Sequence, residues 1–139
     1  MLKLIFHKQR ELQTSSYGVD PSTLDGEDRR RYIVDMTTAL TDELHEALAE
    51  TGWKPWATSR HFNRSAYLDE LIDALHFLIN LMLVAGTDAD EITRRYLEKN
   101  ARNAARQQAG YDGVTGKCTN CGRALDDKNV TCTKEQCDA

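Results

Sequence analysis

The segment YLDELIDALHF, residues 67–77, places two carboxylates inside an otherwise apolar run. Apolar residues continue at helical spacing to about Val84, and Gly86 then provides a stop signal. Within this segment Glu70 and Asp73 stand three residues apart, on one face of the expected helix. Carboxylates on a buried face are costly unless cations accompany them. We therefore expect this helix to line a metal site and not only a closed core.

Three further helices are expected in addition to this one, which covers about residues 65–84. They cover about residues 2–14, 27–50 and 88–108. Pro55 lies in a short connector, so the second and third helices are expected to be antiparallel. Thr87 and Asp90 form the pattern of a capping box at the start of the last helix. No strand-like alternation occurs before Gly113, and the predicted fold is an all-α, four-helix bundle.

The second helix carries an acidic stripe beside its apolar stripe. Glu43, Glu46 and Glu50 recur at i, i+3 and i+7. Packed against the Glu70 and Asp73 pair, these acids would repel one another without cations, and Mg²⁺ prefers carboxylate oxygens. The alternative is that the stripe is an ordinary solvated helix face. The pairing of ExxE with ExxD favours the magnesium site.

The composition excludes several classes of protein. The formal net charge of −4 gives no overall attraction to nucleic acid or to an anionic membrane. No apolar run reaches the roughly 18 residues of a membrane span. The first residues become charged too early for the apolar core of a signal peptide. We expect a cytoplasmic protein without a membrane segment and without nucleic acid as its partner.

All four cysteines lie in the last 22 of the 139 residues. Four thiolates can complete a tetrahedral zinc site, and so short and polar a segment has few other means of folding. The alternatives are two disulfides, which a reducing compartment disfavours, or a tail of free thiols. The sequence thus predicts a small zinc ribbon at residues 114–139, after a helical domain at residues 1–113. The predicted Zn²⁺ ligands are Cys118, Cys121, Cys132 and Cys137.

Four short segments resemble a known family. They are IFHKQREL at residues 5–12, WKPW at 53–56, ELIDALHF at 70–77 and KNARNAARQQAGY at 99–111. The last matches the pattern KNxxNxxRQxxGY at every fixed position, and it follows the acid pairs without intervening extra helices. Residues 2–113 are therefore similar to the all-α nucleoside triphosphate pyrophosphohydrolases, which include the MazG-like enzymes and the dimeric dUTPases. Within that group they resemble the compact, phage-type dUTPases.

The resemblance implies Mg²⁺-dependent hydrolysis of dUTP to dUMP and pyrophosphate by an activated water. The implied catalytic residues and Mg²⁺ ligands are Glu43, Glu46, Glu70 and Asp73. An amide suits the uracil edge because it offers a donor and an acceptor, so Asn103 and then Gln9, in preference to Gln13, are the expected base readers. The other implied substrate-binding residues are Trp56, His76 and Phe77 at the base and sugar, and Lys54, Lys99, Arg106 and Tyr111 at the phosphates.

The resemblance also implies a homodimer or higher oligomer, in which a second copy completes the site. Two other functions stay open. One is a MazG-like enzyme that acts on another or a modified deoxynucleotide. The other is a non-catalytic adaptor in which the zinc ribbon is the working part.

Overall fold

The computed structural model describes residues 1–108, which form four α-helices. The helices are α1 (Leu2–Ser16), α2 (Gly26–Ala49), α3 (Arg64–Val84) and α4 (Ala89–Gln108), and a short 3₁₀ helix, η1 (Pro21–Thr23), lies between α1 and α2. The all-α prediction is confirmed over this part of the chain, where no strand forms. The chain divides into two compact units, Met1–Arg94 and Arg95–Ala139, and each is considered by itself.

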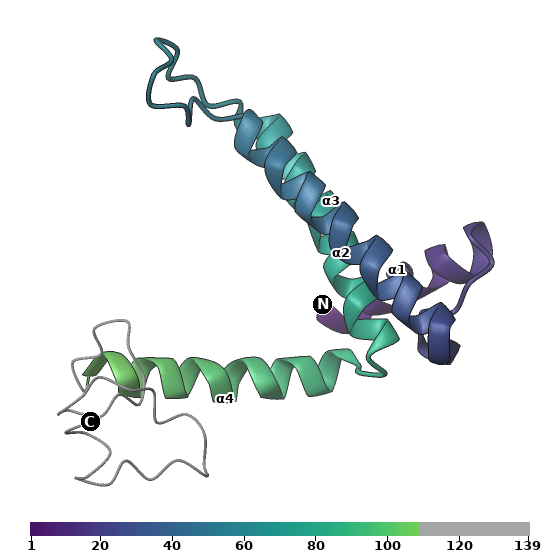
Figure 1. Ribbon diagram of the computed structural model, residues 1–139. Coiled ribbons are helices and arrows are strands. Elements are labelled where there is room, and N and C mark those ends of the chain that lie inside the picture. The colour runs from purple at the N-terminus through teal and green to yellow at the C-terminus, as the bar shows by residue number, and fades with distance from the viewer. Residues whose placement is uncertain (109–139) are drawn as a thin grey trace, which may run out of the picture. The chain divides into compact units, whose positions relative to one another are not determined.

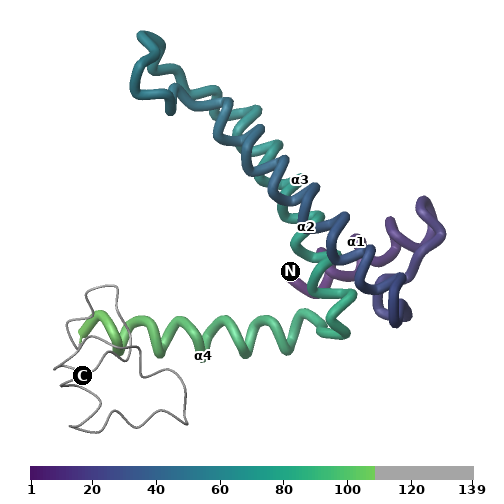
Figure 2. Tube along the Cα trace, viewed as in Figure 1, coloured from purple at the N-terminus to yellow at the C-terminus, as the bar shows by residue number. Residues whose placement is uncertain are grey.

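In the first unit, α2 and α3 pair along their lengths as an antiparallel hairpin (Figure 1). Helix α1 packs against α3 near the end of the hairpin that lies away from the connector (Figure 2). The core at this end contains Phe6, Ile79, Leu83 and Ala89. It joins α1, α3 and the first turn of α4, because each contributes apolar side chains at helical spacing. None of the described helices is both long and apolar enough to cross a membrane.

The end of α3 has the geometry that its sequence predicts. Gly86 has a φ of 75°, its N–H donates to the Leu83 carbonyl, and the Thr87 N–H donates to the Met82 carbonyl. These two bonds form a Schellman motif, in which glycine provides the left-handed residue. The capping prediction for α4 is wrong by one residue. Asp88, and not Thr87, caps the helix, since its carboxylate accepts from the Glu91 N–H at 2.9 Å.

Candidate active site

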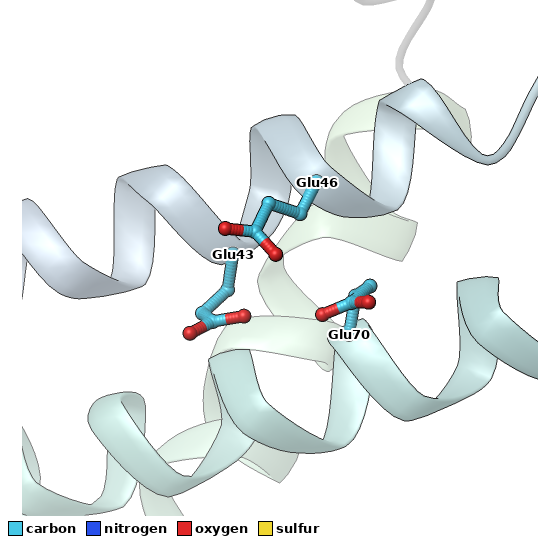
Figure 3. A group of neighbouring side chains, drawn as sticks. All are labelled: Glu43, Glu46 and Glu70. Atoms are coloured by element: carbon cyan, nitrogen blue, oxygen red, sulfur yellow. The ribbon is translucent and has the colours of Figure 1, made fainter.

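Three acidic side chains converge between α2 and α3 (Figure 3). Glu43 and Glu46 come from consecutive turns of α2, and Glu70 comes from the facing turn of α3. One carboxylate oxygen from each lies within 4.8 Å of the others. The antiparallel pairing thus brings together three of the four acids of the ExxE and ExxD patterns, which are far apart in the sequence. The fourth, Asp73, is near enough for its charge to act on Glu43.

Glu43 is the most perturbed member of this acid cluster. Partial burial raises the pKa of its carboxyl group, and the charges of Glu46 and Asp73 raise it further. The contact with the Glu70 carboxyl group acts in the same direction. Every charged neighbour that shifts this pKa is itself acidic. Carboxylates held together without a compensating charge disfavour their ionised form, and a hard divalent cation with oxygen ligands would reverse that preference.

A cavity of about 380 Å³ adjoins the acid cluster. Glu43 and Asp73 lie in its wall, and the rest is formed by α1, α2, α3 and the turn after α1. Its volume falls within the range of small-molecule sites in proteins. The lining residues are Gln9, Leu12, Gln13, Tyr17, Val19, Tyr32, Met36, Glu43, Asp73, His76, Phe77 and Asn80.

Buried amides form the polar part of this cavity. The Gln9 Nε2 donates to Asn80 Oδ1 at 2.8 Å, and Asn80 is only 1% exposed. On the other side, the Tyr32 hydroxyl donates to Gln13 Oε1 at 3.0 Å. Burial raises the pKa of Tyr32 to about 12, so this hydroxyl keeps its proton at neutral pH. The cavity therefore combines a carboxylate end with an amide end, separated by apolar and aromatic side chains.

The structure brings together part of the predicted substrate site. Gln9, His76 and Phe77 line the cavity beside Asp73. Trp56 does not, because it lies in the connector between α2 and α3, where it is 75% exposed. Three lining residues, Tyr32, Met36 and Asn80, are not among the site residues predicted from the sequence. Gln13 was the less favoured of the two candidate glutamines. No sequence periodicity links these side chains, since their contacts join different helices. The cavity in fact includes both glutamines.

The connector that carries Lys54 and Trp56 is an ordered loop. An isolated antiparallel bridge between Thr51 and Phe62 closes its base. The Arg60 guanidinium donates to four carbonyl groups of the loop, those of Lys54, Pro55, Ala57 and Ser59. Gly52 lies so close to this arginine that an added Cβ would stand 2.6 Å from the Arg60 Cα. The hydrogen bonds of Arg60 thus hold the loop in one conformation in the absence of regular secondary structure.

The change Arg60→Ala is expected to loosen this connector without unfolding the helices. Hydrogen bonds from a charged donor contribute about 1.5–3 kcal/mol each, so the local stability of the loop should fall by about 2 kcal/mol or more. The chain has two tryptophans, Trp53 and Trp56, and both lie in this loop, so tryptophan fluorescence anisotropy measures its order directly. Arg64→Ala, at the start of α3, is the matched control. An unchanged anisotropy in Arg60→Ala would contradict the assigned support.

The remaining predicted phosphate and base contacts belong to the second unit. Lys99, Asn103 and Arg106 lie on α4 at i, i+4 and i+7, so they share one face of that helix, and all three are exposed. Tyr111 and the four predicted zinc ligands, Cys118, Cys121, Cys132 and Cys137, lie outside the described residues.

Comparison with known families places the acid cluster in context. A family model described as dUTPase matches residues 1–88, which include all four predicted Mg²⁺ ligands. The chain belongs to this dUTPase family. The match ends near the start of α4. Comparison of this dUTPase-family chain with solved structures gave no match.

Two phage proteins are similar to this member of the dUTPase family. The dCTP pyrophosphatase of Enterobacteria phage LZ5 is 35% identical over an alignment of 97 residues, and the match covers 58% of this chain and 56% of that protein. The dCTP pyrophosphatase of Enterobacteria phage T4 is 27% identical over 104 residues, covering 58% of this chain and 61% of that protein. The matched regions thus span little more than half the length of these relatives.

Proposed function

We propose that this chain is a nucleoside triphosphate pyrophosphohydrolase that converts dUTP to dUMP and pyrophosphate. The observation that carries the proposal is the acid cluster of Glu43, Glu46 and Glu70 at one end of a cavity whose other end is built from buried amides. Such a cavity matches the two ends of a nucleotide, since phosphates need cations and a pyrimidine edge needs paired donors and acceptors. Membership of the dUTPase family supports the same assignment.

The proposed Mg²⁺ ligands are Glu43, Glu46, Glu70 and Asp73. These side chains suit Mg²⁺ because they are carboxylates held close together. No cationic side chain among residues 1–108 acts on Glu43 to lower its pKa, so a bound metal ion would supply the missing positive charge. Bound Mg²⁺ would neutralise the phosphate charge, which is the main demand of phosphoryl transfer. Glu43 is also proposed to orient the attacking water and to receive its proton, the role that the resemblance to this family implies.

At the other end of the cavity, Gln9 and Asn80 are proposed to face the pyrimidine edge, and His76 and Phe77 to contact the base and deoxyribose. A residue that excludes thymine must clash with its 5-methyl group, because a pocket indifferent to one methyl separates substrates by only about 1–3 kcal/mol. Lys54, Trp56, Lys99, Asn103, Arg106 and Tyr111 remain proposed substrate contacts on the evidence of the sequence.

The test is release of nucleoside monophosphate and pyrophosphate from dUTP, dCTP, dTTP, dATP, dGTP and UTP, with Mg²⁺ and with EDTA. We expect metal-dependent hydrolysis of dUTP well above that of dTTP and UTP. Preference for a purine or a modified deoxynucleotide would instead support a MazG-like enzyme of other specificity. Absence of hydrolysis with every nucleotide would contradict the enzyme assignment and favour the adaptor.

Hydrolysis of dCTP is the second candidate activity. A specific observation favours it, because both phage relatives are named dCTP pyrophosphatase although the family model is described as dUTPase. Uracil and cytosine share their ring size and their O2 acceptor, so a cavity shaped for one accommodates the other. The same nucleotide panel measures this activity directly.

We also propose that the chain forms a homodimer or higher oligomer. Large apolar side chains are exposed on the paired helices, among them Val34 and Leu44 on α2 and Leu68 and Ile72 on α3. Apolar surface of this extent on a helical hairpin indicates a contact with another molecule. Light scattering over a range of concentrations gives the oligomeric state.

Zinc binding by Cys118, Cys121, Cys132 and Cys137 stays a proposal based on their spacing. One zinc ion per chain, measured by elemental analysis of the purified protein, is the expected result.

A further inference from the structure

The hydrogen bond between Gln9 and Asn80 joins two side chains of unusual burial. Gln9 is 4% exposed and Asn80 is 1% exposed, and the two residues, on α1 and α3, are 71 positions apart in the sequence. Both line the cavity that ends at Glu43 and Asp73. Buried amides that serve only packing are costly compared with apolar residues of the same volume. Because they lie in the wall of the cavity, these amides can offer donors and acceptors to a ligand.

The bond couples the orientation of Gln9 to that of Asn80. Because its Nε2 donates to Asn80 Oδ1, its Oε1 is the amide atom left to accept from a ligand. The opposite orientation preserves the same bond, since Asn80 can donate its Nδ2 to Gln9 Oε1 when both amides turn over. In that arrangement Gln9 presents its nitrogen as a donor. The pair thus has two self-consistent states with opposite hydrogen-bonding character.

Little holds Asn80 in the first state. Its Nδ2 donates to the Met36 sulfur at 3.4 Å, and thioether sulfur is a weak acceptor. Reversal therefore loses one weak contact and keeps the Gln9 bond. An amide also has nearly the same shape in both orientations, so the surrounding side chains need not move. The two states should differ little in free energy, and a bound base can select between them.

Uracil and cytosine differ in the way that these two states differ. Uracil has a donor at N3 and an acceptor on C4, whereas cytosine has an acceptor at N3 and a donor on C4. An amide complements the first pattern in one orientation and the second pattern in the other. We propose that the Gln9–Asn80 pair is a reversible reader that lets one cavity accept both dUTP and dCTP. The state in the structure, with the Gln9 oxygen available, is assigned to uracil.

A second amide, Gln13, lines the same cavity. The Tyr32 hydroxyl donates to Gln13 Oε1, so in this orientation the Gln13 nitrogen is the group available as a donor. The Tyr32 hydroxyl can also accept a hydrogen bond, so Gln13 could turn over and keep this contact. The acceptor that both pyrimidines share is O2, to which the Gln13 nitrogen can donate in the orientation of the structure. Gln13 is therefore assigned to the group that the two bases have in common, and the Gln9–Asn80 pair to the edge that distinguishes them.

The inference rests on the proposed pyrophosphohydrolase activity, and the wild-type protein provides its first test. We expect kcat/KM for dUTP and dCTP to lie within about tenfold of each other, since each base finds a complementary state. Hydrolysis of dUTP with dCTP disfavoured by more than a thousandfold would overturn the reversible reader and leave the proposed activity intact. Hydrolysis of neither nucleotide would remove the proposed activity itself.

The second test uses Asn80→Asp, in which an ionised carboxylate can only accept and so locks Gln9 in the uracil state. We expect kcat/KM for dCTP to fall at least tenfold relative to that for dUTP, within the range of about 5- to 150-fold that an unmatched buried polar group costs. Asn80→Leu, which removes both hydrogen-bonding groups, should lower the two activities by the same factor. Asn63→Asp, at an exposed position outside the cavity, controls for the added charge.

The ratio of kcat/KM for dUTP to kcat/KM for dCTP separates a loss of base recognition from a loss of folded protein, because a folding defect lowers both values by the same factor. An Asn80→Asp protein that loses both activities equally, or loses dUTP selectively, would overturn the assignment. If this variant does not fold, the wild-type comparison of dUTP with dCTP still decides the question.

Discussion

Replacing Glu43 with glutamine should lower kcat/KM for dUTP by about 10²–10⁴-fold, the usual contribution of a general base. Glutamine keeps the shape of the side chain but cannot accept the proton of an attacking water or carry charge toward Mg²⁺. Glu43 contacts the Glu70 carboxyl group, and the charge of Asp73 also raises its pKa; Glu43 and Asp73 both line the cavity. The effect should appear mainly in kcat, because the amide end of the cavity still binds the base.

Glu11→Gln is the matched control for this variant. Glu11 is an exposed residue of α1 whose ion pair with Lys8 lies at the surface, where such pairs contribute little. It should retain wild-type kinetics. Activity of Glu43→Gln within a few fold of the wild type would show that Glu43 is neither the base nor an essential ligand, and would move that role to Glu46, Glu70 or Asp73.

The helices were predictable because their signals are local. Apolar residues recur at helical spacing, Gly86 supplies a left-handed C-terminal residue, and Pro55 lies in the connector. The N-terminal cap of α4 was misplaced because Thr87 and Asp88 are both good capping residues. The choice depends on which side chain reaches a free N–H, and here Asp88 bonds to Glu91 while the Thr87 hydroxyl donates to the Glu91 carboxylate.

The candidate site was predictable only where its residues follow a helical repeat. The spacing of Glu43 and Glu46, and of Glu70 and Asp73, places each pair on one face of its helix. Antiparallel packing of the two helices then brings the two faces together. The pairing of Gln9 with Asn80 depends on how α1 crosses α3, which no local pattern specifies. The role of Arg60 was also hidden, because an arginine that bonds to several loop carbonyls has no characteristic spacing.

Mg²⁺ is expected to raise the stability of the wild-type protein and to have little effect on Glu43→Gln. Binding of an ion to the folded state alone adds about 2.7 kcal/mol when its concentration is a hundred times Kd. For a chain of this size that corresponds to a rise in Tm of roughly 10 °C. The measurement is thermal unfolding with excess Mg²⁺ and with EDTA, followed by circular dichroism, and it does not require activity.

With Mg²⁺ the wild-type protein should be more stable than Glu43→Gln, and without metal Glu43→Gln should be the more stable of the two. A carboxyl group whose pKa is higher in the folded state than in the unfolded state destabilises the fold at pH values above the folded pKa, and Glu43 has such a raised pKa. In EDTA at pH 8, Glu43→Gln should therefore be more stable than the wild type, by about 1 kcal/mol or less because the cluster is partly solvated. Glu11→Gln should show neither effect. If the wild type were the more stable protein in EDTA, the acids would be stabilised by contacts within the chain, and the need for a cation at this cluster would disappear.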